Sequence, residues 1–318
     1  MFHKIISLFD RIGEKVEKYK IAFAGTGIIG SGLAVNAMIA GNRVSLYDVV
    51  PVEKVRENIE NIMCIMVELG AVEQKTANQL LSEVLITNNL EEAVRDADFV
   101  QECVPERVDL KKQTYRVIQE VNGNKTVISS ATSAKFPTEL QEGALYPEVI
   151  LVGHPYNPSY LLPLIEVCGG TQTSQKAIQL AMDVYNAMRK VPVLCRKEEK
   201  GFIANKISWG VMDSAKQVVE QGICSVEDVD KAIMYGPGLR MAVTGQLLTM
   251  SLGVNGGYRE YEKKYMGKES ASPEYIALAE GIDEALERRS EEQGRTAKEV
   301  IVYRDRMIAE ILKAQNMF

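Results

Sequence analysis

The sequence predicts an α/β protein with a mostly parallel sheet, followed by an all-α C-terminal domain. From Lys20 onward, short β-branched runs alternate with helical patterns, which is the order expected of βαβ units in a parallel sheet. A glycine-rich turn follows the first of these runs. After residues 196–201, RKEEKG, no strand pattern returns. We therefore expect a sheet domain over residues 20–199 and a helical domain over residues 200–318.

Eight short runs are expected to form the strands, because each is rich in apolar or β-branched residues and is bounded by turn or polar residues. They are residues 21–25, 43–48, 84–87, 98–103, 126–130, 149–153, 164–169 and 191–195. Helical periodicity is clearest between them in three segments, residues 33–40, 53–73 and 174–190. This alternation places successive strands side by side in one sheet.

The C-terminal domain is predicted to hold about five helices. The first runs from Phe202 to Gln221, with Gly222 suited to its C-terminal cap. Further helix starts are marked by side chains that can accept hydrogen bonds from unpaired amides. These are Ser225 with Asp228, Ser272 before Pro273, and Thr296 with Glu299.

Residues 1–19 carry apolar side chains at helical spacing, interrupted by acids. The acids, and the lack of a small-residue cleavage site, argue against a signal peptide. We expect an amphipathic helix that packs on the protein or on a second subunit. Weak contact with a membrane surface is the alternative, and no later segment is apolar for long enough to span a bilayer.

Composition narrows the class of protein. The chain has 318 residues, 46% hydrophobic and 25% charged, with a net charge of −6. This charge leaves no basic face for phosphates, so a nucleic-acid partner is not expected. The five cysteines are scattered and form no CxxC pair, which argues against disulfides and a zinc site. We expect a cytoplasmic protein without a metal.

A dinucleotide site is predicted at residues 21–32, IAFAGTGIIGSG. Gly25, Gly27 and Gly30 form a GxGxxG pattern directly after a strand and at the start of a helix. The first glycine permits the turn, the second lets the backbone approach a pyrophosphate, and the third lets the helix pack on the strand. The helix start that faces the anion would include Ile28 and Ile29. This context indicates a Rossmann-type domain, although a bare GxGxxG often marks only a turn.

Asp48 bears on the choice of cofactor. It ends the second strand, eighteen residues after Gly30, where a carboxylate can accept hydrogen bonds from ribose hydroxyls. Its charge would repel a 2′-phosphate, so NAD is favoured over NADP. The alternative is a turn residue at a strand end.

His154 is the only histidine beyond the first three residues, and Glu166 follows it by twelve positions, with apolar runs around both. A carboxylate beside an imidazole fixes its tautomer and stabilises the imidazolium formed when a proton is taken. Any imidazole acid–base chemistry near neutral pH therefore falls to His154. The alternative is a core histidine satisfied by backbone carbonyls.

Ordered motifs add a family resemblance. The glycine turn, QECVPE at 101–106, SSATSA at 129–134 and GHPYNP at 153–158 occur in the order of the 3-hydroxyacyl-CoA dehydrogenase superfamily. The chain resembles that superfamily from about Lys20 to beyond Gly245. Its YGPGLR stretch and its GRTAKEV ending are more similar to the branch that acts on small free hydroxy acids, which includes L-carnitine dehydrogenase and L-gulonate 3-dehydrogenase.

The resemblance implies that His154 is the general base and Glu166 its orienting partner, with Ser133 and Asn205 as polar groups at the reacting oxygen. Such a division of labour suits oxidation of a secondary alcohol, which needs a base and hydrogen-bond partners for an oxygen whose charge changes. The nicotinamide accepts the hydride. Residues implied to line the cofactor are Val104, Glu106, Lys111 and Ser133.

Each of these residues has a plainer interpretation. Ser133 is one of several turn residues after a strand, and Glu106 can serve only to favour the next helix start. Asn205 lies inside a helical run, where asparagine is locally unfavourable, so its side chain should have a specific partner. We expect that partner to be substrate or Ser133, with core backbone as the alternative.

The expected substrate is a small L-3-hydroxy acid, carnitine-like first. The 53–73 helix carries five glutamates against one lysine and one arginine, so it offers a poor surface to the phosphates of coenzyme A. Arg240 is the candidate clamp for a carboxylate, or else it ties two helices. Aromatic faces that can hold a quaternary ammonium include Tyr156 and Trp209. Carnitine-type enzymes tend to have phenylalanine in place of Tyr156 and an acid in place of Asn205.

Two alternatives stay open at this point. One is a short 3-hydroxyacyl-CoA ester as substrate. The other is an NADH-binding, crystallin-like protein without turnover. The presence of all four implied catalytic residues disfavours it, namely Ser133, His154, Glu166 and Asn205. The resemblance also implies a homodimer formed through the helical domain.

Overall fold

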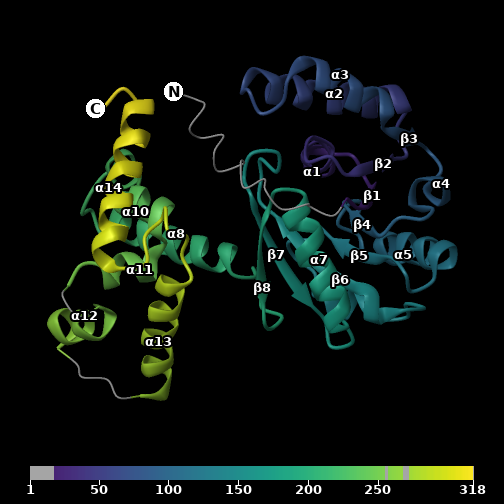
Figure 1. Cartoon of the computed structure of the whole chain (residues 1–318). Coiled ribbons are helices and arrows are strands. Elements are labelled where there is room, and N and C mark those ends of the chain that lie inside the picture. Colours follow the sequence, from purple (N-terminus) through teal and green to yellow (C-terminus); the bar gives the residue numbers. More distant parts are fainter. Residues whose placement is uncertain (1–17, 255–256, 268–271, 318) are drawn as a thin grey trace. The chain divides into compact units, whose positions relative to one another are not determined.

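The computed structural model describes residues 18–254, 257–267 and 272–317. Contacts divide the chain into two compact units, up to Trp209 and from Gly210 onward. Helix α8 (Ala204–Glu220) runs across this boundary (Figure 1). The helix expected at residues 1–19 falls outside the described residues, apart from the last two. The expected division at residue 199 stays a prediction.

The N-terminal unit contains one eight-stranded sheet in the order β3-β2-β1-β4-β5-β6-β7-β8. All neighbouring strands pair in parallel except β6 and β7, which confirms the mostly parallel sheet. The strands are β1 (Lys20–Ala24), β2 (Arg43–Tyr47), β3 (Leu85–Thr87), β4 (Phe99–Glu102), β5 (Val127–Ser130), β6 (Ile150–Pro155), β7 (Leu164–Gly169) and β8 (Val191–Cys195). Each matches one of the eight expected runs.

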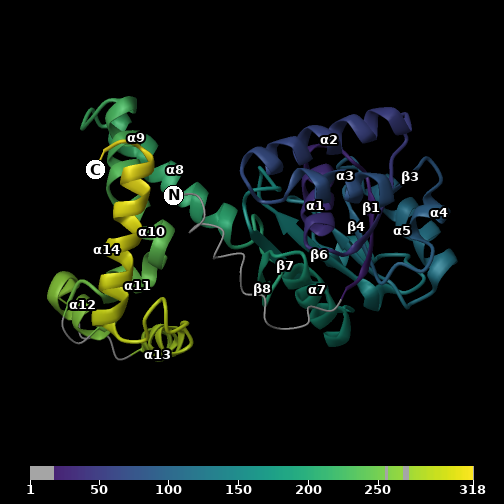
Figure 2. The same cartoon turned by 45° about the horizontal axis from the view of Figure 1, so that its top comes forward.

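Helices pack on both faces of this sheet (Figure 2). Alternating side chains explain the two layers, since Phe23 of β1 belongs to one core and Ala24 to the other. Side chains of four helices join the core around Phe23, namely α1 (Ile28–Ile39), α2 (Val52–Glu68), α3 (Gln74–Glu83) and α7 (Gln175–Ala187). The other core takes side chains from α4 (Leu90–Val94), α5 (Val108–Asn122) and α6 (Pro137–Gln141).

One expected helix is wrong in its extent. The pattern at 53–73 predicted a continuous helix, but α2 ends at Glu68 and α3 begins only at Gln74. Gly70 adopts a φ of +72° between them. This left-handed conformation ends a helix at little cost for glycine, although the apolar spacing continues through Ala71 and Val72.

The C-terminal unit is helical, as predicted. Besides the end of α8, its described helices are α9 (Val226–Tyr235), α10 (Pro237–Thr244), α11 (Gln246–Ser251), α12 (Gly257–Met266), α13 (Pro273–Glu287) and α14 (Ala297–Ala314). The hydroxyls of Ser225, Ser272 and Thr296 accept the expected backbone hydrogen bonds. The helices are more numerous than expected because Gly236 and Gly245 separate short ones.

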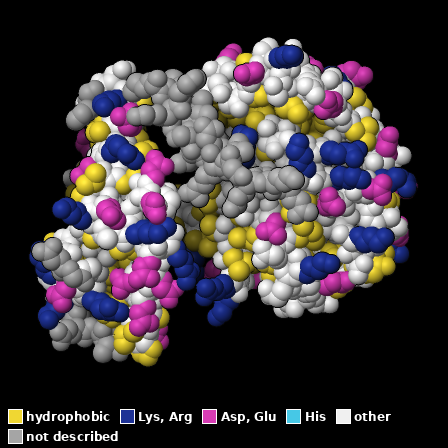
Figure 3. Space-filling view, in the orientation of Figure 1, with side chains coloured by type: hydrophobic (Ala, Val, Ile, Leu, Met, Phe, Trp, Pro, Cys, Tyr) yellow, Lys and Arg dark blue, Asp and Glu magenta, His cyan; other side chains and the backbone are white. Residues whose placement is uncertain are grey.

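The surface carries charges of both signs. Figure 3 shows acidic and basic side chains interspersed over the visible face of each unit. Among the described residues, none of the helices combines the length and the apolar character needed to cross a membrane.

Candidate active site

The topology brings the sequence motifs to one edge of the sheet. Strands β1, β4, β5 and β6 are consecutive parallel neighbours, so their carboxyl ends lie along the same edge. The glycine turn follows β1, Cys103 follows β4, Ser133 lies just beyond β5, and His154 lies near the end of β6. The chain order reverses between β1 and β4. Ligands of open α/β sheets bind at such a switch point.

The glycine turn is tightly packed. Gly25 has a φ of +100°, and a Cβ added there would lie 2.5 Å from the carbonyl oxygen of Cys103. A Cβ on Gly30 would lie 2.0 Å from the carbonyl oxygen of Gly25. At Gly27, by contrast, no heavy atom of the described chain lies within 4 Å of such a Cβ. Helix α1 begins at Ile28 without a side-chain cap, and its first amides are available to an anion.

Asp48 fastens this turn to the end of β2. Its Oδ2 accepts hydrogen bonds from the backbone N–H of Thr26 at 2.6 Å and from the Thr26 hydroxyl at 2.8 Å. Its Oδ1 accepts from the N–H of Val49 at 2.7 Å. Thr26 was not predicted from the sequence, because a residue between two glycines of the motif carries no pattern of its own.

His154 and Glu166 face each other across the antiparallel β6–β7 pair. The distance from His154 Nδ1 to Glu166 Oε2 is 2.9 Å, and the side chains are 8% and 0% exposed. The other carboxylate oxygen accepts hydrogen bonds from the N–H groups of Ile203 and Ala204, at 2.7 and 2.8 Å. Burial acts to raise the pKa of Glu166, but these hydrogen bonds and the one from His154 outweigh it and lower the pKa.

Two aromatic rings confine the imidazole. Phe202 stacks on it with ring centroids 5.5 Å apart, and Tyr156 meets it edge-on at the same separation. Because Glu166 accepts from Nδ1–H, the Nε2 atom of the neutral ring is an acceptor. Within the described chain, Nε2 has no hydrogen-bond partner. Nε2 is therefore the ring nitrogen that this contact leaves open.

Asn205 has a side-chain partner within the described chain that the sequence did not suggest. The Tyr156 hydroxyl donates a hydrogen bond to Asn205 Oδ1 at 2.5 Å. Burial, followed by the charge of Glu166, raises the pKa of Tyr156, so the hydroxyl stays protonated. Tyr156 thus contacts both the His154 ring and Asn205.

A second polar cluster lies between β4 and α5. The side chain of Lys111 is 1% exposed and pairs with Glu102 at 2.8 Å and with Glu106 at 3.3 Å. The backbone N–H of Val104 donates to Glu102 at 2.8 Å. Glu102 was not singled out in the sequence, since a glutamate near a strand end has no distinctive pattern.

The remaining candidates take no part in the contacts described above. Ser133 is exposed in the turn after β5, and its hydroxyl has no partner among the described residues. The Trp209 ring packs over Gly201, where an added Cβ would lie 2.5 Å from ring carbons. Arg240 lies on α10 of the C-terminal unit with an exposed side chain.

Comparison with known proteins identifies the family. The model of the 3-hydroxyacyl-CoA dehydrogenase NAD-binding domain matches residues 20–199, and that of the C-terminal domain matches residues 201–295. The chain therefore belongs to the 3-hydroxyacyl-CoA dehydrogenase family. It is an NAD-dependent dehydrogenase that acts on a CH–OH group. The open space at Gly27, the free amides of α1 and the Asp48 carboxylate fit this cofactor.

Several relatives share a more specific name. L-carnitine dehydrogenase of Oceanobacillus iheyensis is 38% identical over 77% of this chain and 80% of its own length. The enzyme of Streptomyces coelicolor with the same name is 33% identical over 93% of this chain and 94% of its own. That of Pseudomonas aeruginosa is 35% identical over 92% of each chain.

Solved structures show the same fold. The 3-hydroxyacyl-CoA dehydrogenase of Archaeoglobus fulgidus superposes with a TM-score of 0.67 at 23% identity, covering 94% of this chain and 100% of that one. The (S)-3-hydroxybutyryl-CoA dehydrogenase of Ralstonia eutropha gives 0.65 at 20% identity, covering 85% and 95%.

Proposed function

We propose that this protein oxidises a small L-3-hydroxy acid to the 3-oxo acid with NAD, with His154 as the general base and a carnitine-like substrate favoured. The observation that carries the proposal is the buried His154–Glu166 pair, which leaves Nε2 as the open nitrogen of the ring. Relatives named L-carnitine dehydrogenase, 33–38% identical over most of the chain, support the choice of substrate.

In this proposal, His154 Nε2 takes the hydroxyl proton as the carbon is oxidised. When bound, NAD would supply the hydride acceptor. Glu166 holds Nδ1–H and stabilises the imidazolium that forms, because its charge lies 2.9 Å from the ring. Phe202 and Tyr156 exclude water from two sides of the imidazole. The imidazole is therefore already oriented before a substrate binds.

Two further residues are assigned to the reacting oxygen. Asn205 lies one residue after Ala204, whose N–H binds Glu166, so the start of α8 brings the asparagine to the histidine. With its Oδ1 occupied by Tyr156, Asn205 presents its Nδ2 as a donor. Ser133 is assigned as the second donor, from the turn after β5. Such donors stabilise negative charge that develops on the oxygen.

The cofactor residues follow the edge of the sheet. The glycine turn, with the amides of Ile28 and Ile29, is assigned to the pyrophosphate, and Asp48 to the adenosine ribose. Val104, Glu106 and Lys111 are assigned to the nicotinamide half. From β1 to β6 there are three strand spacings, about 14 Å in all, and an extended dinucleotide would run along them toward His154.

Three further residues are assigned to the substrate, one from the C-terminal unit and two from the N-terminal unit. Arg240 is proposed to bind the carboxylate, because its planar fork matches two oxygens. Tyr156 and Trp209 are proposed to offer aromatic surface to an ammonium group. In the structure both rings also hold other residues in place, Asn205 and Gly201 respectively.

A substrate panel tests the proposed function. The purified protein is incubated with NAD and L-carnitine, D-carnitine, L-3-hydroxybutyrate, L-gulonate or (S)-3-hydroxybutyryl-CoA, and NADH absorbance is followed. We expect the highest kcat/KM with L-carnitine and none above background with the D-enantiomer. A higher kcat/KM with the coenzyme A ester would replace the proposed substrate.

A further inference from the structure

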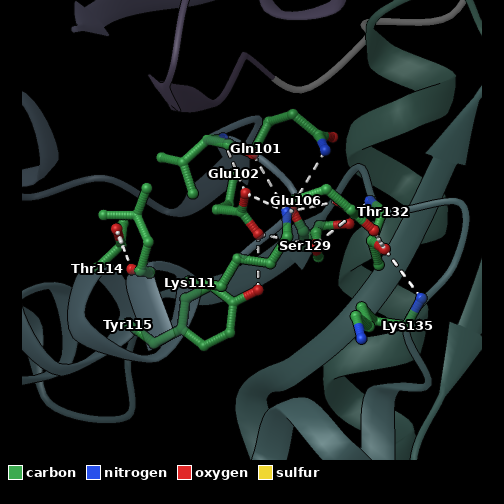
Figure 4. A network of polar contacts seen from close by, with 12 residues as sticks. Gln101, Glu102, Glu106, Lys111, Thr114, Tyr115, Ser129, Thr132 and Lys135 are labelled. Carbon is green, nitrogen blue, oxygen red and sulfur yellow. Dashed lines mark hydrogen bonds and ion pairs between the residues drawn. The ribbon is translucent and has the colours of Figure 1, made fainter. Parts of the chain in front are cut away.

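A buried ion pair lies beside the proposed nicotinamide site. Glu102 is 0% exposed and Lys111 is 1% exposed, and their charged atoms are 2.8 Å apart. Figure 4 shows both among the polar side chains that gather between β4 and α5. Neither group is on the path of the proton in the proposed reaction.

Glu102 has a full set of donors. Its Oε1 accepts from Lys111 Nζ and from the N–H of Val104, each at 2.8 Å. Its Oε2 accepts from the hydroxyls of Tyr115 and Ser130, each at 2.7 Å. Donors from β5, from α5 and from the residues after β4 thus hold the Glu102 carboxylate in one orientation.

Lys111 connects the buried Glu102 to the more exposed Glu106. Besides Glu102, its ammonium donates to the carbonyl oxygen of Val104 at 3.3 Å and pairs with Glu106 Oε2 at 3.3 Å. The ammonium thus makes two hydrogen bonds and one further ion pair. The other oxygen of Glu106 accepts from the Thr132 hydroxyl. Glu106 is 44% exposed and is the most exposed charged group of this cluster (Figure 4).

Stability alone gives little reason for such an arrangement. Taking a lysine and a glutamate out of water costs several kcal/mol per ion before pairing, and apolar residues of similar volume often serve as well or better. What an ion pair adds is a charge at a fixed place. Here that charge is the Lys111 ammonium, and what it fixes at the surface is the Glu106 carboxylate.

We propose that Glu102 is a positioning residue for the cofactor. It holds Lys111 so that Lys111 and Thr132 together fix the Glu106 carboxylate where the nicotinamide half of NAD binds. This inference rests on the proposed function, which assigns Glu106 to that half of the cofactor. Glu102 itself touches no ligand, and its effect passes through Lys111 to Glu106.

The test is a double-mutant cycle on NADH binding. The NADH Kd of each full-length variant is measured by fluorescence titration. Glu102→Gln keeps the side chain's shape, and its amide nitrogen can face the hydroxyls of Tyr115 and Ser130, which are able to accept. The Lys111 ammonium then loses the charge of Glu102 and keeps its ion pair with Glu106. We expect the NADH Kd to rise about tenfold. Glu106→Ala should weaken binding by a similar factor.

The two changes together should be non-additive, because Glu102 acts through Glu106. Glu102→Gln added to Glu106→Ala is therefore expected to change the NADH Kd less than twofold. Lys112→Met is the matched control on the same helix, since Lys112 forms an exposed ion pair with Glu142. Its NADH Kd should equal that of the wild type. Thermal unfolding of every variant accompanies the titrations.

A buried pair that serves only the fold gives a different pattern. In that case Glu102→Gln lowers the unfolding temperature with the NADH Kd unchanged, or its effect adds fully to that of Glu106→Ala. Either result overturns the inference. If Glu106→Ala itself leaves the NADH Kd unchanged, the assignment of Glu106 in the proposed function is wrong, and the inference falls with it. No substrate is needed, so the outcome is independent of the substrate panel.

Discussion

Glu166 joins three parts of the N-terminal unit through one carboxylate. It lies on β7, accepts a hydrogen bond from His154 on β6, and accepts two more from backbone amides at the start of α8. A helix N-terminus favours a negative charge at this place. The residue that orients the proposed base therefore also secures the helix that carries Asn205.

This arrangement predicts a pH-dependent contribution to stability. The folded pKa of Glu166 is lowered from its ordinary value of 4.5. Its charged form thus stabilises the fold above about pH 4.5, and the contribution disappears as the pH falls through the folded pKa. Glu166→Gln should lower the free energy of unfolding at neutral pH by about 1–3 kcal/mol. Urea unfolding of both proteins measures this difference.

The difference between wild type and Glu166→Gln should shrink steadily below pH 4.5, because protonated Glu166 resembles glutamine in charge. Glu148→Gln, a change of a residue outside this network, provides the comparison. A difference that stays constant down to the acid limit of folding would show that the charge of Glu166 contributes nothing.

At the residue scale, a contact can be predicted from the sequence only where a sequence pattern marks both residues. His154 and Glu166 were recognisable because a lone histidine and a glutamate occupy neighbouring apolar runs, and the antiparallel pairing then places them opposite each other. The Tyr156–Asn205 hydrogen bond joins positions 49 residues apart. No spacing rule predicts it, since it depends on how α8 starts against the sheet.

At the scale of elements, α1 and its glycine turn are the part of the fold proposed to bind the pyrophosphate. Gly27 and Gly30 belong to one motif but meet different surroundings. A Cβ at Gly30 would collide with backbone, whereas one at Gly27 would meet open space in the described chain. Gly27 has a φ of −66°, which alanine adopts without strain.

A pair of alanine substitutions separates these two roles. Gly27→Ala should leave the unfolding temperature unchanged and raise the NADH Kd about tenfold or more, because its methyl group occupies the space assigned to the pyrophosphate. Gly30→Ala should destabilise the fold by more than 2 kcal/mol, roughly the scale of overpacking in a core. Thermal unfolding and NADH titration of both variants provide the measurements. Equal effects of the two variants on NADH binding at equal stability would contradict this division.

Elements were predicted better than their ends. All eight strands and the caps of three C-terminal helices follow from local signals, namely β-branched runs and hydroxyl side chains before helices. The 53–73 helix was drawn too long because Gly70 acts through its backbone conformation, which apolar periodicity does not reveal. The division of the helical domain at Gly236 and Gly245 was missed for a similar reason.

At the scale of the whole molecule, the residues proposed for the reaction fall in both units of the chain. The N-terminal unit contains the glycine turn, His154, Glu166 and Asn205. The C-terminal unit contains Arg240, the proposed carboxylate ligand. The family resemblance also predicts a homodimer, and this stays a prediction. The central claim is tested on the full-length protein.

The most direct measurement compares wild type with His154→Gln in a single-turnover experiment with NAD and the best substrate of the panel. The account predicts that the rate of NADH formation falls by about 100- to 10,000-fold, the usual contribution of a general base, while the NADH Kd stays within twofold of the wild-type value. A His154→Gln variant that forms NADH at the wild-type rate would contradict it.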